Sequence, residues 1–174
     1  MISIEKANIN HAQLLAEIAQ LTFQESHGHS ASAKDITNYI TEKYSADALK
    51  KELQDPANIF HILYHHNTAA GYSKIILNFP YEYCSVENIA KLERIYLLEK
   101  FYNLHLGQAL LAFNINLIKE NKQTGVWLFV WKENERAIQF YIKNGFIVIG
   151  SYEFKIAENH SNPNHRMLLR FNQL

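Results

Sequence analysis

The sequence is poor in the residues that mark several classes of protein. Its one cysteine, Cys84, excludes an internal disulfide bond and fits a reducing compartment. It has no run of about eighteen apolar residues, so no membrane-spanning helix is expected. Its N-terminus carries acidic and polar residues from the start, unlike a signal peptide. With six glycines and three prolines there is no low-complexity linker, so residues 1–174 are expected to form one cytoplasmic domain.

The chain also has no excess of charge of either sign. The 17 Lys+Arg residues balance 17 Asp+Glu residues, which argues against nucleic-acid binding by phosphate neutralisation and against attachment to an anionic membrane. The two halves differ, because residues 1–87 hold 6 basic and 10 acidic residues and residues 88–174 hold 11 and 7. The first half would suit a cationic ligand and the second an anionic one, unless the asymmetry is chance.

Hydrophobic periodicity predicts a mixed α/β fold. An early hairpin with a turn at His66-Asn67 requires antiparallel pairing, and a later strand–helix–strand–helix–strand run implies a parallel crossover. We therefore expect a mixed sheet with helices on both faces. The expected strands are 2–7, 58–65, 69–79, 89–98, 125–131, 146–155 and 165–171, and the expected helices are 11–25, 35–44, 46–53, 107–119 and 135–144.

The junction between strand 89–98 and helix 107–119 carries the first candidate for binding. Backbone N–H groups at a helix N-terminus are unpaired within the helix and, with the helix dipole, attract anions. Gly107 would let the backbone approach a phosphate closely. Taken alone the pattern is weak, because any strand–helix junction with one glycine looks similar.

The sequence around this junction, LERIYLLEKFYNLHLGQALLAF, resembles motif A of the GCN5-related N-acetyltransferase (GNAT) superfamily. In that motif a loop of the form Arg/Gln-x-x-Gly-x-Gly/Ala binds the pyrophosphate of acetyl-coenzyme A. Gly107 matches the second glycine. Tyr102 stands at the Arg/Gln position and His105 at the first glycine, so two of the three signature positions depart from the motif.

A second segment, VWKENERAIQFYIKNGF, resembles motif B of the same superfamily. The two motifs cover residues 90–150, and within the superfamily the sequence is most similar to bacterial PaiA-type polyamine acetyltransferases. The resemblance implies a GNAT fold of about seven strands with a splay between the fourth and fifth, residues 126–130 forming the fifth. It also implies acetyl-CoA as co-substrate and no metal. The residues in register with motif B are Asn134, Ala137, Phe140, Tyr141, Gly145 and Phe146.

The resemblance also assigns roles to individual residues. Tyr141 would be the general acid that protonates the departing thiolate, since a phenol is protonated at neutral pH; the alternative is that Tyr141 is a core aromatic residue. A larger set of residues would bind the cofactor, and within it the backbone of residues 95–97 would pair with the pantetheine arm. These cofactor-binding residues are Ile95, Tyr96, Leu97, Asn103, Leu104, His105, Leu106, Gly107, Gln108, Asn134, Ala137 and Phe140.

Glu93 is the candidate general base, acting through a water molecule. Strand alternation places it on the side of Ile95 and Leu97, which favours partial burial and a raised pKa. The alternative is a structural ion pair with a neighbouring Lys or Arg.

The acceptor is less well defined. A polyamine-like amine needs carboxylates and aromatic faces, and the first half of the chain supplies Glu25, Tyr39, Glu42, Tyr44, Tyr81, Glu82 and Tyr83. His27 and His29 either line the acceptor site or lie on the surface. His65 and His66 are expected in a solvated turn, and no histidine group has recognisable metal-ligand spacing. Cys84 has no basic neighbour and is interpreted as an apolar filler.

The sequence thus predicts an N-acetyltransferase that moves the acetyl group of acetyl-CoA to a primary amine, by direct attack, on a small polyamine-like acceptor. Two alternatives stay open: a protein or peptide amine as acceptor, and a non-catalytic module that binds CoA or a partner protein. The resemblance also implies a homodimer formed through the C-terminal strands. The apolar segment 165–171 would serve this purpose or would complete the sheet.

Overall fold

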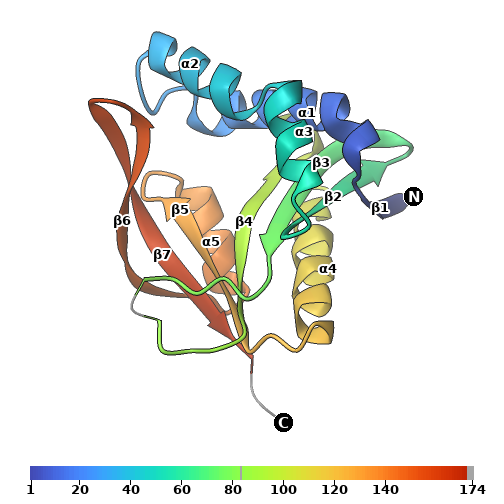
Figure 1. The fold of residues 1–174 in the computed structure, drawn as a ribbon, viewed down its shortest axis with the longest axis vertical. Helices are drawn as coiled ribbons and strands as arrows, with labels where there is room; N and C mark the ends of the chain where they lie inside the picture. Colours follow the sequence, from blue (N-terminus) through green and yellow to red (C-terminus); the bar gives the residue numbers. More distant parts are fainter. Residues whose placement is uncertain (83, 172–174) are drawn as a thin grey trace. The chain divides into compact units, whose positions relative to one another are not determined.

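The computed structural model describes residues 1–82 and 84–171 (Figure 1). Tyr83, one of the expected acceptor residues, lies outside the described residues. The chain forms two compact units, Met1–Ile75 with Arg94–Asn114 and Ile76–Glu93 with Ile115–Leu174. Strand β4 and helix α4 run through both units, and β3 ends with the first residue of the second unit.

The order of elements confirms the predicted mixed α/β fold. Seven strands form one sheet in the order β1-β2-β3-β4-β5-β7-β6. The strands are β1 (Ile2–Lys6), β2 (Asn58–His65), β3 (Thr68–Ile76), β4 (Ile89–Leu97), β5 (Gly125–Trp131), β6 (Ile147–Ala157) and β7 (His160–Arg170). The helices are α1 (Ala12–His27), α2 (Ala33–Lys43), α3 (Ala46–Gln54), α4 (Leu106–Glu120) and α5 (Glu135–Lys143), with short 3-10 turns η1 (Ile9–His11) and η2 (Glu99–Phe101). None of the helices described is both long and apolar enough to cross a bilayer.

The first unit contains the predicted hairpin of β2 and β3. Its two-residue turn has left-handed backbone at both His66 and Asn67, with φ of 47° and 62°, as a type I′ hairpin turn requires. Strand β1 pairs antiparallel with β2, from Ile2 opposite His65 to Lys6 opposite His61.

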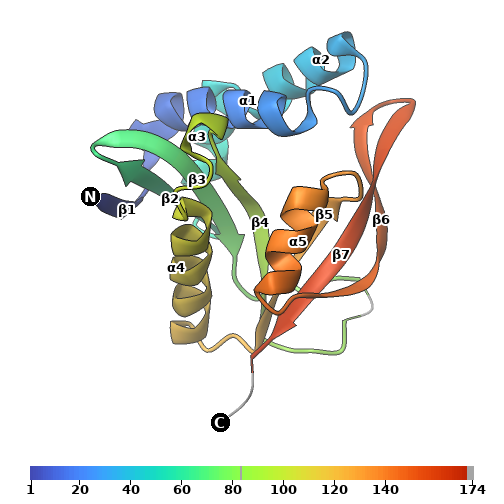
Figure 2. The same ribbon diagram turned by 180° about the vertical axis from the view of Figure 1, so that it is seen from behind.

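Helices cover both faces of this part of the sheet. Helices α3 and α4 lie on opposite sides of β2 and β3, as the two views show (Figures 1 and 2). Ser32 and Ser45 cap α2 and α3 by accepting backbone N–H groups, which explains why these helices begin where they do. The expectation of helices on both faces is confirmed.

The second unit holds the parallel crossover. Strand β4 pairs in parallel with β5 over Ile89–Lys91 and Gly125–Trp127, and the ladder does not continue to Leu92 and Glu93 within this unit. The fourth and fifth strands therefore part after three residue pairs, as the predicted splay requires.

Strand β7 differs most from the prediction. It begins at His160 rather than His165, because it pairs along its length with β6, and that pairing overrides the low strand propensity of Asn162, Pro163 and Asn164. It also pairs with β5, from Gly125 opposite Arg170 to Trp131 opposite Asn164. The segment 165–171 thus completes the sheet, and β6 forms its edge.

Candidate active site

The loop that joins β4 to α4 is tightly folded. The Leu98 amide donates to the Ala70 carbonyl at 2.9 Å, and the amides of Phe101 and Tyr102 donate to Leu98 and Glu99 within η2, each at 2.9 Å. The Glu99 amide donates to the Glu25 carboxylate, also at 2.9 Å. These bonds hold the chain in a fixed path up to the residues that precede α4.

Two residues of this loop have left-handed backbone conformation. Asn103 has φ of 64° and His105 has φ of 57°, whereas Leu104 between them does not have a positive φ. Such a conformation costs most residues about 1–2 kcal/mol and is easy only for glycine and, to a lesser degree, asparagine. His105 therefore adopts the backbone conformation that a glycine at this position would favour. A left-handed residue beside one without a positive φ also occurs in the backbone nests that bind anions.

The start of α4 adds further N–H groups at the same place. Ala109 donates to the His105 carbonyl at 3.2 Å, so the amides of Leu106 and Gly107 come before the first helical bond and have no partner within the helix. Leu106 is fully buried and Leu110 with it, in a cluster that includes Leu63 and Ala70. This apolar anchor holds the helix end in place while Leu104 and His105 remain exposed.

Strand β4 presents different side chains on its two faces near this loop. Ile95 and Leu97 pack against the cluster around Leu106. Tyr96 lies on the other face, with its ring 5.9 Å from that of Tyr72 and 6.2 Å from that of His27. The backbone here is close to β3, because a Cβ added at Gly71 would lie 2.3 Å from the Tyr96 carbonyl oxygen.

His27 belongs to an aromatic group on the α1 side of β4. Its ring stacks on Phe23 at 4.8 Å, and Phe23 stacks on Tyr39 at the same distance. Burial, followed by the charge of His29, lowers the pKa of His27 to about 4. His27 is thus neutral at neutral pH, while His29 is exposed; their predicted place at the acceptor site stays a prediction.

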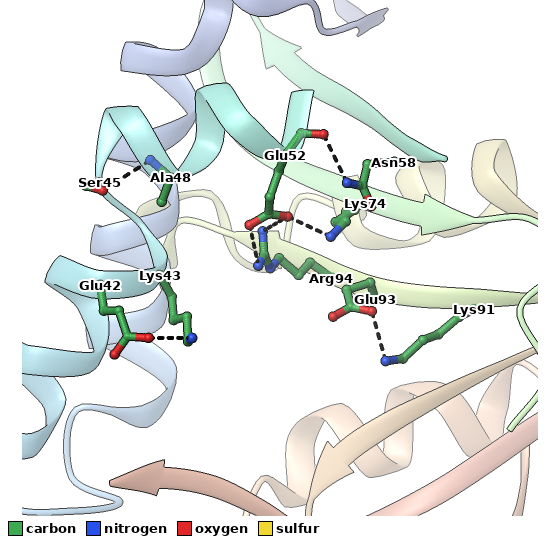
Figure 3. A network of polar contacts seen from close by, with 10 residues as sticks. All are labelled: Glu42, Lys43, Ser45, Ala48, Glu52, Asn58, Lys74, Lys91, Glu93 and Arg94. Atoms are coloured by element: carbon green, nitrogen blue, oxygen red, sulfur yellow. Dashed lines mark hydrogen bonds and ion pairs between the residues drawn. The ribbon is translucent and has the colours of Figure 1, made fainter. Parts of the chain in front are cut away.

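A charge network that was not identified from the sequence joins residues of α3, β3 and β4 (Figure 3). Arg94 of β4 donates to both carboxylate oxygens of Glu52, at 2.9 and 3.0 Å, and Lys74 donates to the same carboxylate at 2.6 Å. The Arg94 guanidinium also lies 5.0 Å from the centre of the Tyr44 ring. The Glu52 carboxylate is therefore the shared partner of two cations, Arg94 and Lys74, whose side chains are only 13% and 7% exposed.

In the second unit, Tyr141 is a buried residue of α5. It is 7% exposed and its ring packs 5.5 Å from Phe140 and 5.4 Å from Phe146. Burial raises the pKa of the phenol above its ordinary value, so Tyr141 is protonated at neutral pH and is able to donate a proton. This agrees with both interpretations of Tyr141, as an acid and as a core aromatic residue.

Asn134 begins α5 as predicted. Its side-chain oxygen accepts the Ala137 amide at 3.1 Å, and the helix ends before Gly145, which has φ of 85°. The Asn134 side chain therefore fixes the start of the helix that carries Tyr141.

Glu93 forms the ion pair that was the alternative interpretation. Its carboxylate lies 2.8 Å from the Lys91 ammonium, and its side chain is 27% exposed (Figure 3). Lys91 in turn lies over three aromatic rings, 5.4 Å from Phe79, 4.9 Å from Trp127 and 5.4 Å from Phe129. The ion pair fixes the position of the Glu93 carboxylate, and the three rings hold the Lys91 ammonium beside it.

The predicted acceptor residues are divided between the two units. Glu25 accepts the Glu99 amide, Glu42 pairs with the exposed Lys43 at 2.6 Å, and Tyr44 is buried. Tyr81 belongs to the second unit, where it packs beside Trp127 and Cys84. Cys84 lies in that apolar cluster, which fits its interpretation as a filler. Glu82 is exposed.

No group of three metal-ligating side chains occurs among residues 1–82 and 84–171. The rings of His65 and His66 contact each other at 4.4 Å, and His66 is exposed at the hairpin turn and lies 3.4 Å from the Met1 amine. This placement agrees with the predicted solvated turn.

A comparison with protein families matches residues 14–146 to the acetyltransferase (GNAT) family. The chain belongs to the GNAT family. As a GNAT protein it is an acetyl-CoA-dependent N-acetyltransferase. The matched region includes the loop before α4 and the whole of α5.

Individual relatives of this GNAT protein are distant. An uncharacterised N-acetyltransferase of Lactobacillus delbrueckii subsp. lactis is 28% identical over 142 residues, 82% of each chain. The spermidine N(1)-acetyltransferase of Thermoplasma acidophilum is 28% identical over 147 residues, 84% of this chain and 89% of that one. The crystal structure of the PaiA N-acetyltransferase of the same organism, in complex with coenzyme A, superposes with a TM-score of 0.79 at 23% identity, covering 98% and 99% of the two chains. The last similarity confirms the fold.

Proposed function

We propose that this protein transfers the acetyl group of acetyl-CoA to a primary amine of a small, polyamine-like acceptor, and that residues 1–174 act as one domain in doing so. The observation that carries the proposal is the loop Tyr102–Leu106. Its left-handed residues and the N-terminus of α4 present a set of backbone N–H groups to an anion of the size of a pyrophosphate.

The residues present fit acetyl-CoA. Backbone amides from Asn103 to Gln108 would hold the pyrophosphate, and this donor set does not depend on side-chain identity, so Tyr102 and His105 are compatible with it. The backbone of Ile95–Leu97 would pair with the pantetheine arm. In the second unit, Asn134, Ala137 and Phe140 at the start of α5 would contact the cofactor. The co-substrate supplies an acetyl thioester, whose carbonyl carbon an amine attacks.

Tyr141 would act as the general acid. Burial keeps its phenol protonated, so it would donate a proton to the departing sulfur. In the balanced step the nitrogen–carbon bond forms and the carbon–sulfur bond breaks. The amine proton leaves to the base, and the thiolate receives the Tyr141 proton, which is replaced through solvent.

Glu93 would accept the amine proton through a water molecule. Its ion pair with Lys91 fixes the position of the carboxylate. Its partial exposure leaves room for water at the carboxylate.

The polyamine-like class is supported by two observations. A relative of 28% identity is a spermidine acetyltransferase, and residues 1–87 carry an excess of acidic residues. Since Glu25 and Glu42 already contact other groups of the protein, neither is assigned to the acceptor here. We also propose that the protein forms a homodimer, with β6 as the edge strand available for it.

A panel of amines with a thiol-release assay tests the proposal. Diamines and polyamines should release CoA with saturation, and mass spectrometry should find one acetyl group on the amine. A tetrapeptide with a free N-terminus tests the alternative acceptor class. Tight binding of acetyl-CoA with no turnover on any amine would contradict the catalytic assignment and leave the CoA-binding module.

A further inference from the structure

Arg166 of β7 carries a half-buried guanidinium that lies near two aromatic rings. Its guanidinium carbon lies 5.3 Å from the centre of the Tyr81 ring and 5.6 Å from that of Phe129. No carboxylate in the described part of the chain forms an ion pair with it. Its Nε atom is buried and has no hydrogen-bond partner. Leaving a donor of a charged group unsatisfied is costly, so an anion bound at this guanidinium would stabilise it.

A neighbouring side chain offers the complementary group. Asn164 lies two residues before Arg166 on the same side of β7, because the ladder to β5 is regular between them. Asn164 is 7% exposed, and its side-chain oxygen is buried without a hydrogen-bond partner. A planar donor and a separate acceptor on one strand match the two charges of an amino-acid head group, the carboxylate and the α-ammonium.

The proposed base lies near the same aromatic ring. The Lys91 ammonium, paired with Glu93 at 2.8 Å, is 5.4 Å from the Phe129 centre. Arg166 is 5.6 Å from that centre, so the two cations are within about 11 Å of each other. A separation of up to this size leaves room for an aliphatic chain of four or five carbons together with the polar groups at its two ends. Phe79 and Tyr152, which are 42% and 44% exposed, offer apolar contact at this surface.

The charges of this surface favour an acceptor that carries a carboxylate beside its amines. Lys91, Arg166 and Glu93 together leave one excess positive charge, which attracts a carboxylate. We propose that the acceptor is a diamino acid, whose head group binds Arg166 and Asn164 and whose distal amine receives the acetyl group. This inference rests on the proposed function and narrows its acceptor from a polyamine-like amine to one that carries a carboxylate.

Two matched pairs of acceptors test the inference. Lysine differs from cadaverine, and ornithine from putrescine, by one carboxylate. The wild-type protein should use each diamino acid at least about tenfold better in kcat/KM than its diamine, and should acetylate the distal amine. In Arg166→Gln, kcat/KM for lysine should fall about 10- to 100-fold while that for cadaverine stays the same.

Lys155→Gln is the matched control. It also removes one positive charge, from an exposed residue of β6, and should leave both acceptors unchanged. If Arg166→Gln does not fold, as judged by its Tm and acetyl-CoA affinity, Arg166→Lys replaces it. That variant keeps the charge but loses the planar fork, and should raise KM for lysine alone.

Equal use of lysine and cadaverine by the wild-type protein would overturn the inference, as would a parallel fall for both in the Arg166 variant. Turnover of cadaverine in either case would leave the proposed function standing. If no amine is acetylated, the proposed function fails. The binding of lysine to the protein then tests the head-group site on its own. Lysine should then quench the fluorescence of Trp127, which lies beside Phe129, in the wild type and not in Arg166→Gln. Absence of that difference would refute the site.

Discussion

Glu52 is expected to be the charged residue whose loss destabilises the first unit most. Its carboxylate is the shared partner of Arg94 and Lys74, at 2.9 Å and 2.6 Å (Figure 3). Replacing Glu52 with glutamine keeps the size of the side chain and removes its charge. Two cations that are 13% and 7% exposed are then left beside each other without a counter-charge.

The size of the effect follows from this burial. Breaking a buried ion pair by removing one partner costs about 3–5 kcal/mol. Because the Glu52 side chain is 23% exposed, solvent screens part of the interaction, so the expected loss is about 3 kcal/mol, near the low end. For a chain of this length that corresponds to a fall in Tm of about 6–12 °C.

Urea unfolding of the purified protein, followed by circular dichroism, measures the free energy of unfolding. Glu42→Gln is the control, because Glu42 forms an exposed pair with Lys43 and its loss should cost less than about 0.5 kcal/mol. A loss below about 1 kcal/mol for Glu52→Gln, or equal losses for the two variants, would refute the reasoning.

Three further predictions concern single residues. Tyr141→Phe should keep the affinity for acetyl-CoA and lower kcat about 100-fold; an unchanged kcat in the thiol-release assay would rule out the acid role. His105→Gly should raise the free energy of unfolding by up to about 1 kcal/mol, because it removes the cost of the left-handed backbone, whereas His105→Val should lower it. The pKa of His27 is lowered to about 4 by burial and by His29, so the folded state opposes protonation. The stability that neutral His27 provides is complete above about pH 6.5 and is lost as the pH falls toward 4, by about 2 kcal/mol at pH 5. His27→Gln should flatten that part of the curve, and an unchanged pH dependence of urea unfolding would contradict the assignment.

The sequence predicted those parts of the fold that local patterns determine. The hairpin was predicted because alternating apolar residues flank His66-Asn67, both of which adopt left-handed backbone. Helix α5 was predicted because Asn134 is a side-chain cap and Gly145 a stop. The start of β7 was missed because Asn162 and Pro163 are poor strand residues and only pairing with β6 brings them into the sheet.

The site could be predicted only where a motif lies within one segment. The loop at Asn103–Leu106 follows from its position between a strand and a helix, although its left-handed residues carry no glycine signal. The Glu52, Lys74 and Arg94 network joins residues far apart in the chain, so no local pattern reveals it. The same holds for Arg166, whose lack of an anionic partner is visible only once Tyr81 and Phe129 are placed around it.

Calorimetric titration of the purified protein with acetyl-CoA tests the central claim most directly, which is that the loop before α4 binds the cofactor despite Tyr102 and His105. The account predicts saturable binding at one site per chain with a Kd in the micromolar range. Gly107→Glu, which places a carboxylate at the start of α4, should weaken that binding strongly. No binding up to millimolar acetyl-CoA would contradict the account.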